Sequence, residues 1–103
     1  MSNELGQIMA TRTFDRAGGG SVVLNIGKVS VDPADGGRFR CPFQFVGVGD
    51  EKVRFSYGED ELQALELAVD RAFMYLEAQE EVRKGHLTWL GGPDLRRVRG
   101  SSS

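Results

Sequence analysis

Apolar residues recur at steps of three and four along residues 61–84, the longest periodic stretch of the chain. On an α-helix this spacing gathers side chains on one face. The members of this stripe are Leu62, Leu65, Val69, Ala72, Phe73 and Leu76. The pattern predicts an amphipathic helix whose apolar face is covered by another element.

The residues at both ends of this stretch favour the same helix boundaries. Asp60 is a good N-cap residue, and Gln63 follows three positions later, as in a capping box. Gly85 suits the left-handed position that follows a helix C-terminus. We therefore expect one continuous helix over residues 61–84.

Before the helix the apolar period changes to two, which is typical of strands with one buried face. Residues 21–29 and 38–48 both alternate in this way. Their predicted inward residues are Val22, Leu24, Ile26, Phe39, Cys41, Phe43 and Phe45. Pro42 cannot donate to a strand ladder, so it predicts an edge strand or a bulge.

Residues 7–16 and 52–57 predict two further strands. Their inward residues are Ile8, Ala10 and Phe14 in the first, and Val53, Phe55 and Tyr57 in the second. Short Gly-rich and Asp-containing turns separate successive strands and favour hairpins. The predicted fold is an α+β, ββββα two-layer sandwich, in which a single long C-terminal α-helix packs on a four-stranded antiparallel meander sheet.

A chain of 103 residues is long enough for one domain with a modest core. Gly91, Gly92 and Pro93 interrupt regular structure, and an Arg- and Ser-rich stretch follows them. We expect a single domain over residues 1–92 and a flexible C-terminal tail over residues 93–103.

Composition narrows the class of protein. Hydrophobic residues make up 40% and charged residues 27%, and the net charge is −2. Dedicated nucleic-acid binders are strongly basic, so nucleic acid is not the expected partner. Cys41 is the only cysteine, and no signal peptide or membrane-spanning run is visible. We expect a cytoplasmic protein that does not bind membranes.

No catalytic group, metal site or cofactor site is predicted. The glycine runs lack the spacing of phosphate-binding loops, and one histidine with one cysteine cannot form a typical zinc site. Cys41 falls on the inward face of its strand, where a small buried side chain is expected; a reactive thiol is the alternative. His86 follows the helix, where a cap or surface position is expected; a general base is the alternative.

Three groups of residues are candidate partner surfaces. One is a second apolar stripe on the helix, and one is an apolar segment around Trp89 that could instead pack on the end of the sandwich. The third is a polar sheet face that a single helix leaves uncovered. The members are Leu67, Met74, Ala78 and Val82; Leu87, Trp89 and Leu90; and Asn25, Arg40, Gln44, Arg54 and Ser56.

Several short motifs stand out: Cys41-Pro42-Phe43, Gly47-Val48-Gly49, Gln63-Ala64-Leu65 and Leu87-Thr88-Trp89-Leu90-Gly91. On these motifs the chain resembles a family of small uncharacterised bacterial domains of unknown function. The resemblance implies a single bacterial domain and carries over no catalytic residue.

The hypothesis that fits these observations is a non-catalytic protein-interaction module, with a homodimer as one form of the contact. An immunity- or antitoxin-like protein that masks a partner is a narrower alternative. A small enzyme or ligand-binding domain using Cys41 or His86 is the alternative from another class. Contact between nucleic acid and the basic tail at Arg96, Arg97 and Arg99 is the weakest option.

Overall fold

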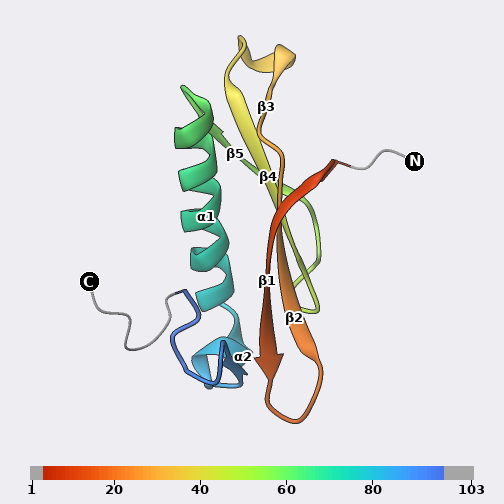
Figure 1. Cartoon of the computed structure of the whole chain (residues 1–103), viewed down its shortest axis with the longest axis vertical. Helices are drawn as coiled ribbons and strands as arrows, with labels where there is room; N and C mark the ends of the chain where they lie inside the picture. The colour runs from red at the N-terminus through yellow and green to blue at the C-terminus, as the bar shows by residue number, and fades with distance from the viewer. Residues whose placement is uncertain (1–3, 97–103) are drawn as a thin grey trace.

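One antiparallel sheet and one main helix form two layers in the computed structural model, which describes residues 4–96 (Figure 1). The strands are β1 (Ile8–Arg16), β2 (Ser21–Gly27), β3 (Ser30–Val31), β4 (Phe39–Val46), β5 (Arg54–Gly58) and β6 (Leu87–Thr88). The helices are the 3-10 turn η1 (Pro33–Asp35), α1 (Glu61–Glu77) and α2 (Glu80–Arg83). The α+β class is confirmed.

The predicted meander accounts for four of the six strands. β1, β2, β4 and β5 pair antiparallel in chain order. The short β3 pairs with β4 beyond the end of β2, and β6 pairs with β1 at Asp15 and Arg16. The predictions of four strands and of a C-terminal helix are wrong, because α2 and β6 follow α1. Strands of two residues are too short to show a period in the sequence.

Pro42 lies in an interior strand, so an edge position is wrong. β4 has β5 on one side and both β2 and β3 on the other. Pairing with β2 ends at Phe43 and pairing with β3 begins at Arg40, so Pro42 faces the interruption between them. The missing N–H of Pro42 therefore costs no ladder hydrogen bond.

The inward face of β5 is the opposite of the predicted one. Ser56 pairs with Cys41, and paired residues of an antiparallel ladder point to the same face. Cys41 is buried under the helix, and Ser56 is only 1% exposed. The predicted inward positions of Phe55 and Tyr57 are therefore wrong, and these side chains belong to the open face. Val53 lies before β5, and the pairing of β5 does not include it.

Small residues explain this choice of face, because α1 approaches β5 closely. A Cβ added at Gly58 would overlap the backbone nitrogen of Ala64 and lie 2.9 Å from its Cα. The buried residues of α1 are Ala64, Ala68, Ala72, Phe73 and Leu76. Leu62 is 61% exposed, so the true inward face is rotated from the predicted stripe toward the alanines. An alanine row lets a helix lie nearer a strand than a leucine row does.

The predicted continuous helix breaks at Ala78 and Gln79, where the backbone of Gln79 is extended. α1 has no basic residue in its last turn, whereas Glu80 and Glu81 occupy the first turn of α2. Negative charge is unfavourable at a helix C-terminus and favourable at an N-terminus, so the break suits this acidic run. α2 then folds under the end of α1 (Figure 1).

The predicted stop at Gly85 is confirmed. Gly85 has a φ of 77°, its N–H donates to Val82 O, and the N–H of His86 donates to Glu81 O. These two bonds form a Schellman motif. No helix within residues 4–96 combines the length and the apolar run that crossing a membrane requires.

Candidate partner-binding site

β5 is an edge strand whose outer side is unpaired in the described part of the chain. The N–H of Asp32 donates to the carbonyl of Arg38 (2.8 Å), which shows that even-numbered residues before and along β4 direct their backbone groups toward β3. Ladder bonds alternate along an antiparallel pair. Phe55 and Tyr57, which lie opposite even-numbered residues, therefore direct their N–H and C=O groups outward. Within residues 4–96 these four groups have no protein partner.

A groove lies between this open edge and α1, and we call it the β5 groove. Its lining residues are Phe43, Arg54, Phe55, Arg71, Met74 and Tyr75. Met74 is 68% exposed, the largest fraction for a methionine in the described chain. The groove thus combines aromatic and apolar walls with two guanidinium groups. It also brings together Met74 and Arg54, which the sequence placed on two different candidate surfaces.

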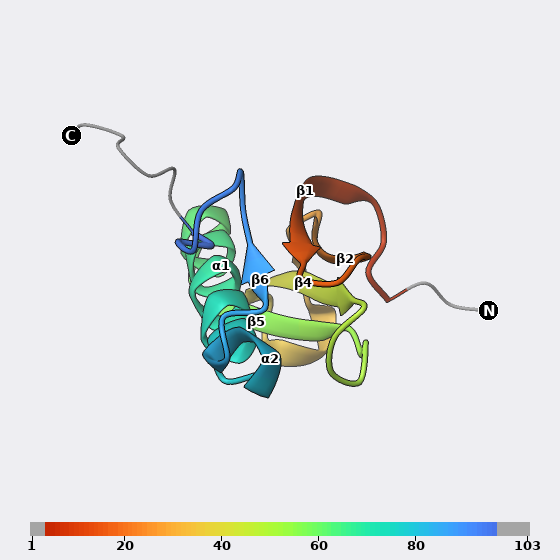
Figure 2. The same cartoon turned by 90° about the horizontal axis from the view of Figure 1, so that it is seen from below.

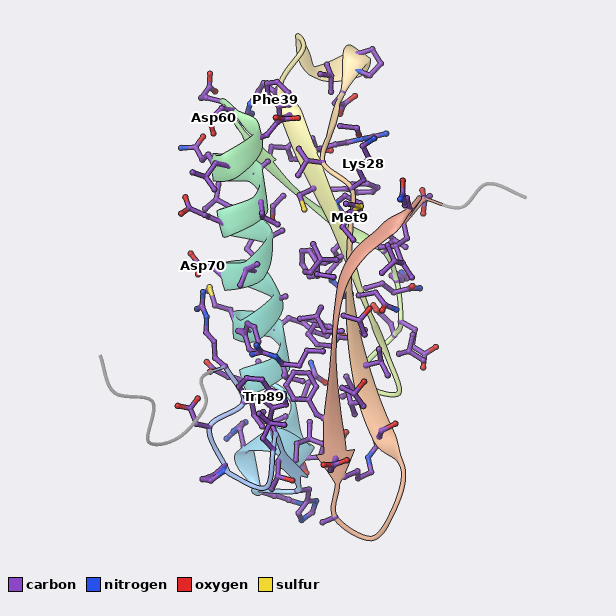
Figure 3. The ribbon with its side chains drawn as sticks, in the orientation of Figure 1. Met9, Lys28, Phe39, Asp60, Asp70 and Trp89 are labelled. Carbon is purple, nitrogen blue, oxygen red and sulfur yellow. The ribbon has the colours of Figure 1, made fainter. Side chains whose placement is uncertain are left out.

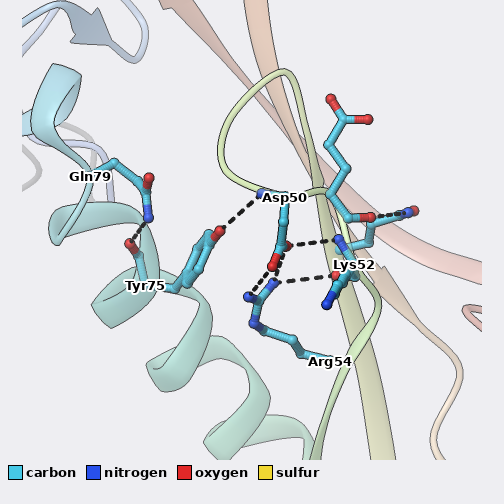
Figure 4. Close-up of polar contacts among 7 residues, drawn as sticks. Asp50, Lys52, Arg54, Tyr75 and Gln79 are labelled. Carbon is cyan, nitrogen blue, oxygen red and sulfur yellow. Dashed lines mark hydrogen bonds and ion pairs between the residues drawn. The ribbon is translucent and has the colours of Figure 1, made fainter.

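Arg54 is held in place by contacts that link the β4–β5 loop to α1 (Figure 4). Its two terminal nitrogens donate to the two oxygens of Asp50, each at 3.0 Å, and its guanidinium carbon lies 4.2 Å from the ring centroid of Tyr75. The N–H of Lys52 also donates to Asp50 (3.0 Å). The Arg54 hydrogen bond and then the Lys52 bond lower the pKa of Asp50 to about 2. The carboxylate is thereby kept ionised and fixes the guanidinium on the groove wall.

The predicted second stripe of α1 is only partly continuous. Leu67, Met74 and Ala78 lie on one flank of α1 by the helical period, the flank that also carries Arg71 in the β5 groove. Val82 belongs to α2 and packs against the core. The helix break turns Val82 away from this flank, so its place in the stripe is wrong.

The predicted polar sheet face loses two of its members. Arg54 and Ser56 point toward α1 because they pair with the inward residues Phe43 and Cys41. Arg40 remains on the open face, with its guanidinium carbon 5.0 Å from the ring centroid of Phe55. This face is also partly covered near Gly27 and Pro42, where Leu5 is buried. No periodicity in the sequence indicated that Leu5 would pack there.

Trp89 lies beside the C-terminal half of α1 and is half-buried against the core (Figure 3). Its ring centroid is 3.5 Å from the guanidinium carbon of Arg12. Trp89 and Gly92 exchange two backbone hydrogen bonds (2.9 and 3.0 Å) around a two-residue turn whose first residue, Leu90, is 70% exposed. Trp89 therefore packs on the sandwich, while Leu90 is the exposed apolar residue of this segment.

A second cleft, of about 240 Å³, lies between α1 and the inward face of β1 and β2. Arg12 and Arg96 line it together with apolar residues. Nη1 of Arg12 donates to the carbonyls of Leu95 (3.1 Å) and Arg96 (2.8 Å), and Arg96 pairs with Asp70 (2.6 Å). Burial and the nearby Arg96 lower the pKa of Arg12. These interactions hold residues 93–96 against the sheet, whereas the rest of the predicted tail, with Arg97 and Arg99, lies outside the described residues.

Cys41 and His86 lie in unlike surroundings. Cys41 is fully buried, and this burial raises the pKa of its thiol to about 11, which disfavours the reactive thiolate. His86 is exposed after α2, and its backbone carbonyl accepts from the N–H of Ala17 (2.7 Å). Within residues 4–96 no three His, Cys, Asp or Glu side chains form a group that could hold a metal ion.

Comparison with known proteins gives one match. The model of a family described as "Domain of unknown function (DUF6968)" covers residues 10–98. Neither a curated protein nor a solved structure matches the chain. The match spans the sheet, both helices and the β5 groove, and it confirms the resemblance to a family of unknown function. The chain is therefore a member of the family DUF6968.

Proposed function

We propose that this protein is a non-catalytic interaction module that binds an extended protein segment by strand addition at β5. The observation that carries the proposal is the outward direction of the N–H and C=O groups of Phe55 and Tyr57. Unpaired strand groups are a template for another strand, and added strands bind mainly through their backbone.

The β5 groove would supply selectivity for side chains of the added segment. Met74 and Tyr75 offer apolar contact, and Arg71 offers positive charge. Side chains of an added strand alternate between the two faces of the sheet, so every second one points toward the groove. Apolar or acidic groups that a partner brings to the α1 side of the sheet complement the groove.

The chemistry of the core supports binding over catalysis. Cys41, the only cysteine, is buried with a raised thiol pKa, and His86 is exposed on another part of the molecule. A nucleophile and its base must lie within hydrogen-bond reach of each other. Cys41 is buried on β4 and His86 is exposed after α2, which argues against such a pair.

Selection of extended peptides from a random library tests the proposal. The substitution Tyr57→Pro removes one outward N–H without removing a bond to β4. We expect peptides selected on the wild type to bind this variant about tenfold more weakly, because a lost hydrogen bond costs about 1–1.5 kcal/mol. Binding is measured by titration calorimetry, with circular dichroism to verify folding.

Two exposed methionines provide a matched control. Met74→Lys changes the β5 groove, whereas Met9→Lys changes an equally accessible residue on β1. We expect only Met74→Lys to weaken peptide binding. Equal loss from both substitutions, or full binding by Tyr57→Pro, contradicts strand addition at β5.

A further inference from the structure

We infer that the segment added at β5 is β5 of a second copy of this chain, paired antiparallel about a two-fold axis at Ser56. The inference rests on the proposed strand addition and names its occupant. Five observations support it: the register available to β5, an unpaired hydroxyl, the position of α1, a charge contact between the helices, and the lack of protection at this edge.

The register follows from the backbone directions. An axis at Ser56 places Phe55 opposite the partner's Tyr57, and Arg54 opposite the partner's Gly58. Phe55 and Tyr57 are the residues whose backbone groups point outward, so each such pair exchanges two hydrogen bonds. The same axis stacks an aromatic pair on the open face and places no like charges opposite each other.

The side chain of Ser56 lacks a partner in the single chain. Its Oγ is buried and makes no hydrogen bond within the described residues. A buried hydroxyl without a partner costs about 1–3 kcal/mol. In the proposed pair the two Ser56 residues form the non-hydrogen-bonded position, where opposed Cβ atoms lie about 4.5–5.5 Å apart. Rotation about χ1 would turn each hydroxyl out of its own chain and toward the other across the axis.

The position of α1 is compatible with this pairing. α1 packs over β4 and β5, and the end-on view shows it against these strands, away from β1 (Figure 2). Two strands at the usual spacing would bring the two α1 axes about 10 Å apart, the distance of packed helices. Ala64 lies level with Gly58, so the rise per residue places Ala68 near the axis. Leu67 of each copy would then contact the other helix.

One charged contact is favourable across this helix pair. Arg71 is the only base between residues 59 and 81. Because the two helices would run antiparallel, Arg71 comes level with the N-terminal half of the partner's α1. That half carries Asp60, Glu61 and Glu66. The arrangement places a guanidinium of each copy beside the acidic part of the other.

The β5 edge also lacks the features that keep edge strands apart. Natural edges are protected by charged residues, prolines, bulges or covering segments. β5 has the sequence Arg-Phe-Ser-Tyr-Gly, and its one charge is engaged with Asp50 and Tyr75. An unprotected strand of this composition is expected to be paired in the working form of the protein.

Disulfide trapping tests the register. The variant Cys41→Ala/Ser56→Cys removes the native thiol and places one cysteine at the axis, where the two Cα atoms would be about 4.5 Å apart and within disulfide range. The matched control Cys41→Ala/Arg54→Cys places the thiols about 13 Å apart along the strands. Under mild oxidation we expect a covalent dimer from the first variant and monomer from the second. Equal crosslinking of both, or none of the first, overturns the inference.

Light scattering during size-exclusion chromatography tests the contact without a new thiol. We expect the wild type to be a dimer at high micromolar concentration and Tyr57→Pro to be a monomer. A dimer that Tyr57→Pro leaves intact lies at another surface and overturns the inference. If the wild type is a monomer but binds selected peptides through β5, the inferred dimer is overturned. The proposed strand addition then stands.

Discussion

The β1 edge and the β5 edge of the sheet differ in the features that keep an edge strand from pairing with another chain. At the β1 edge, β6 pairs with Asp15 and Arg16, a bulge lies between Ile8 and Ala10, and charged residues recur along the strand. At the β5 edge no further strand pairs within residues 4–96, β5 pairs with β4 without a register shift, and its one charged residue is Arg54. The end-on view shows β6 between α1 and β1 (Figure 2). The chain therefore pairs its own β6 with the end of one edge strand and leaves the outer side of β5 unpaired within residues 4–96.

The two edges also differ in how they are held. Phe14 of β1 is fully buried and packs edge-to-face on Phe73, with ring centroids 6.3 Å apart. Arg16 at the end of β1 pairs with Glu81 of α2 (2.9 Å) and donates to the carbonyl of Gly47. β5 instead meets α1 through small residues. The β1 side is therefore stabilised by burial of large side chains. The β5 side is stabilised by close packing of the α1 backbone on the β5 backbone.

Phe14→Ala should give the largest loss of stability. Removing a fully buried phenylalanine costs about 3–5 kcal/mol, whereas Phe55→Ala on the open face of β5 should cost about 1 kcal/mol. Urea unfolding at low micromolar concentration, where the proposed dimer would be dissociated, measures both losses. Equal losses of unfolding free energy would show that Phe14 and Phe55 contribute equally to the core, which contradicts this comparison.

Gly58→Ala should cost about 1–3 kcal/mol, because the added methyl group overlaps Ala64 and pushes α1 away from β5. Ser56→Ala is the matched control on the same strand. It adds no volume and removes a buried hydroxyl without a partner, so it should leave the free energy of unfolding of the monomer unchanged or raised. A tolerated Gly58→Ala would contradict the close packing of α1 on β5.

The sequence was sufficient to predict where the long strands and the main helix lie. It was insufficient to predict which faces of β5 and α1 pack against each other. Alternation in β2 and β4 predicted their buried side chains correctly, because the inward residues are all apolar and most of their outward neighbours are not. In β5 the same rule favoured Phe55 and Tyr57, yet a helix in close contact needs Ser56 and Gly58 inward. Hydrophobicity ranks side chains by the area they bury and carries no information on how closely two backbones approach.

The candidate site was predicted in parts and not as a whole. Met74 and Arg54 were recognised as available residues, but on different surfaces. Their contact depends on the register of β5 and on the rotation of α1, which are set by tertiary packing. Leu5 and β6 were missed for a related reason: segments of one or two residues have no period, and only the finished sheet shows what they cover.

Acid should weaken one ion pair at each edge. The pKa of Asp50 is lowered to about 2 from an ordinary value of 3.8, chiefly by the Arg54 hydrogen bond, and the hydrogen bond from Arg16 likewise lowers the pKa of Glu81. A lowered folded-state pKa stabilises the fold above the ordinary pKa, and this stability is lost as the pH falls through the folded value. Thermal melting between pH 5 and pH 2 should show a smaller acid loss for Asp50→Asn than for the wild type.

Comparing this variant with Glu81→Gln separates the two edges. Asp50→Asn should remove the part of the Tm decrease that occurs between the ordinary aspartate pKa of 3.8 and about pH 2. Glu81→Gln should remove the part of the Tm decrease that begins below the ordinary glutamate pKa of 4.5. Acid curves of both variants that coincide with the wild type would show that neither pair contributes to folding. Asp50→Asn should also loosen Arg54 in the β5 groove.

Leu90→Asn should give the smallest effect and a favourable one. Leu90 has a φ of 52° and Gly91 a φ of 79°, so this two-residue turn requires left-handed backbone at both positions, where asparagine is preferred to leucine. Relief of this strain is worth about 1 kcal/mol, or roughly 4–8 °C in Tm for a domain of this size. Leu62→Asn, at another exposed leucine with ordinary helical geometry, is the control and should give no gain. A gain in Tm that is confined to Leu90→Asn would show that leucine is strained at this position and lowers the stability of the fold. No gain would show that the rest of the turn already compensates for the leucine.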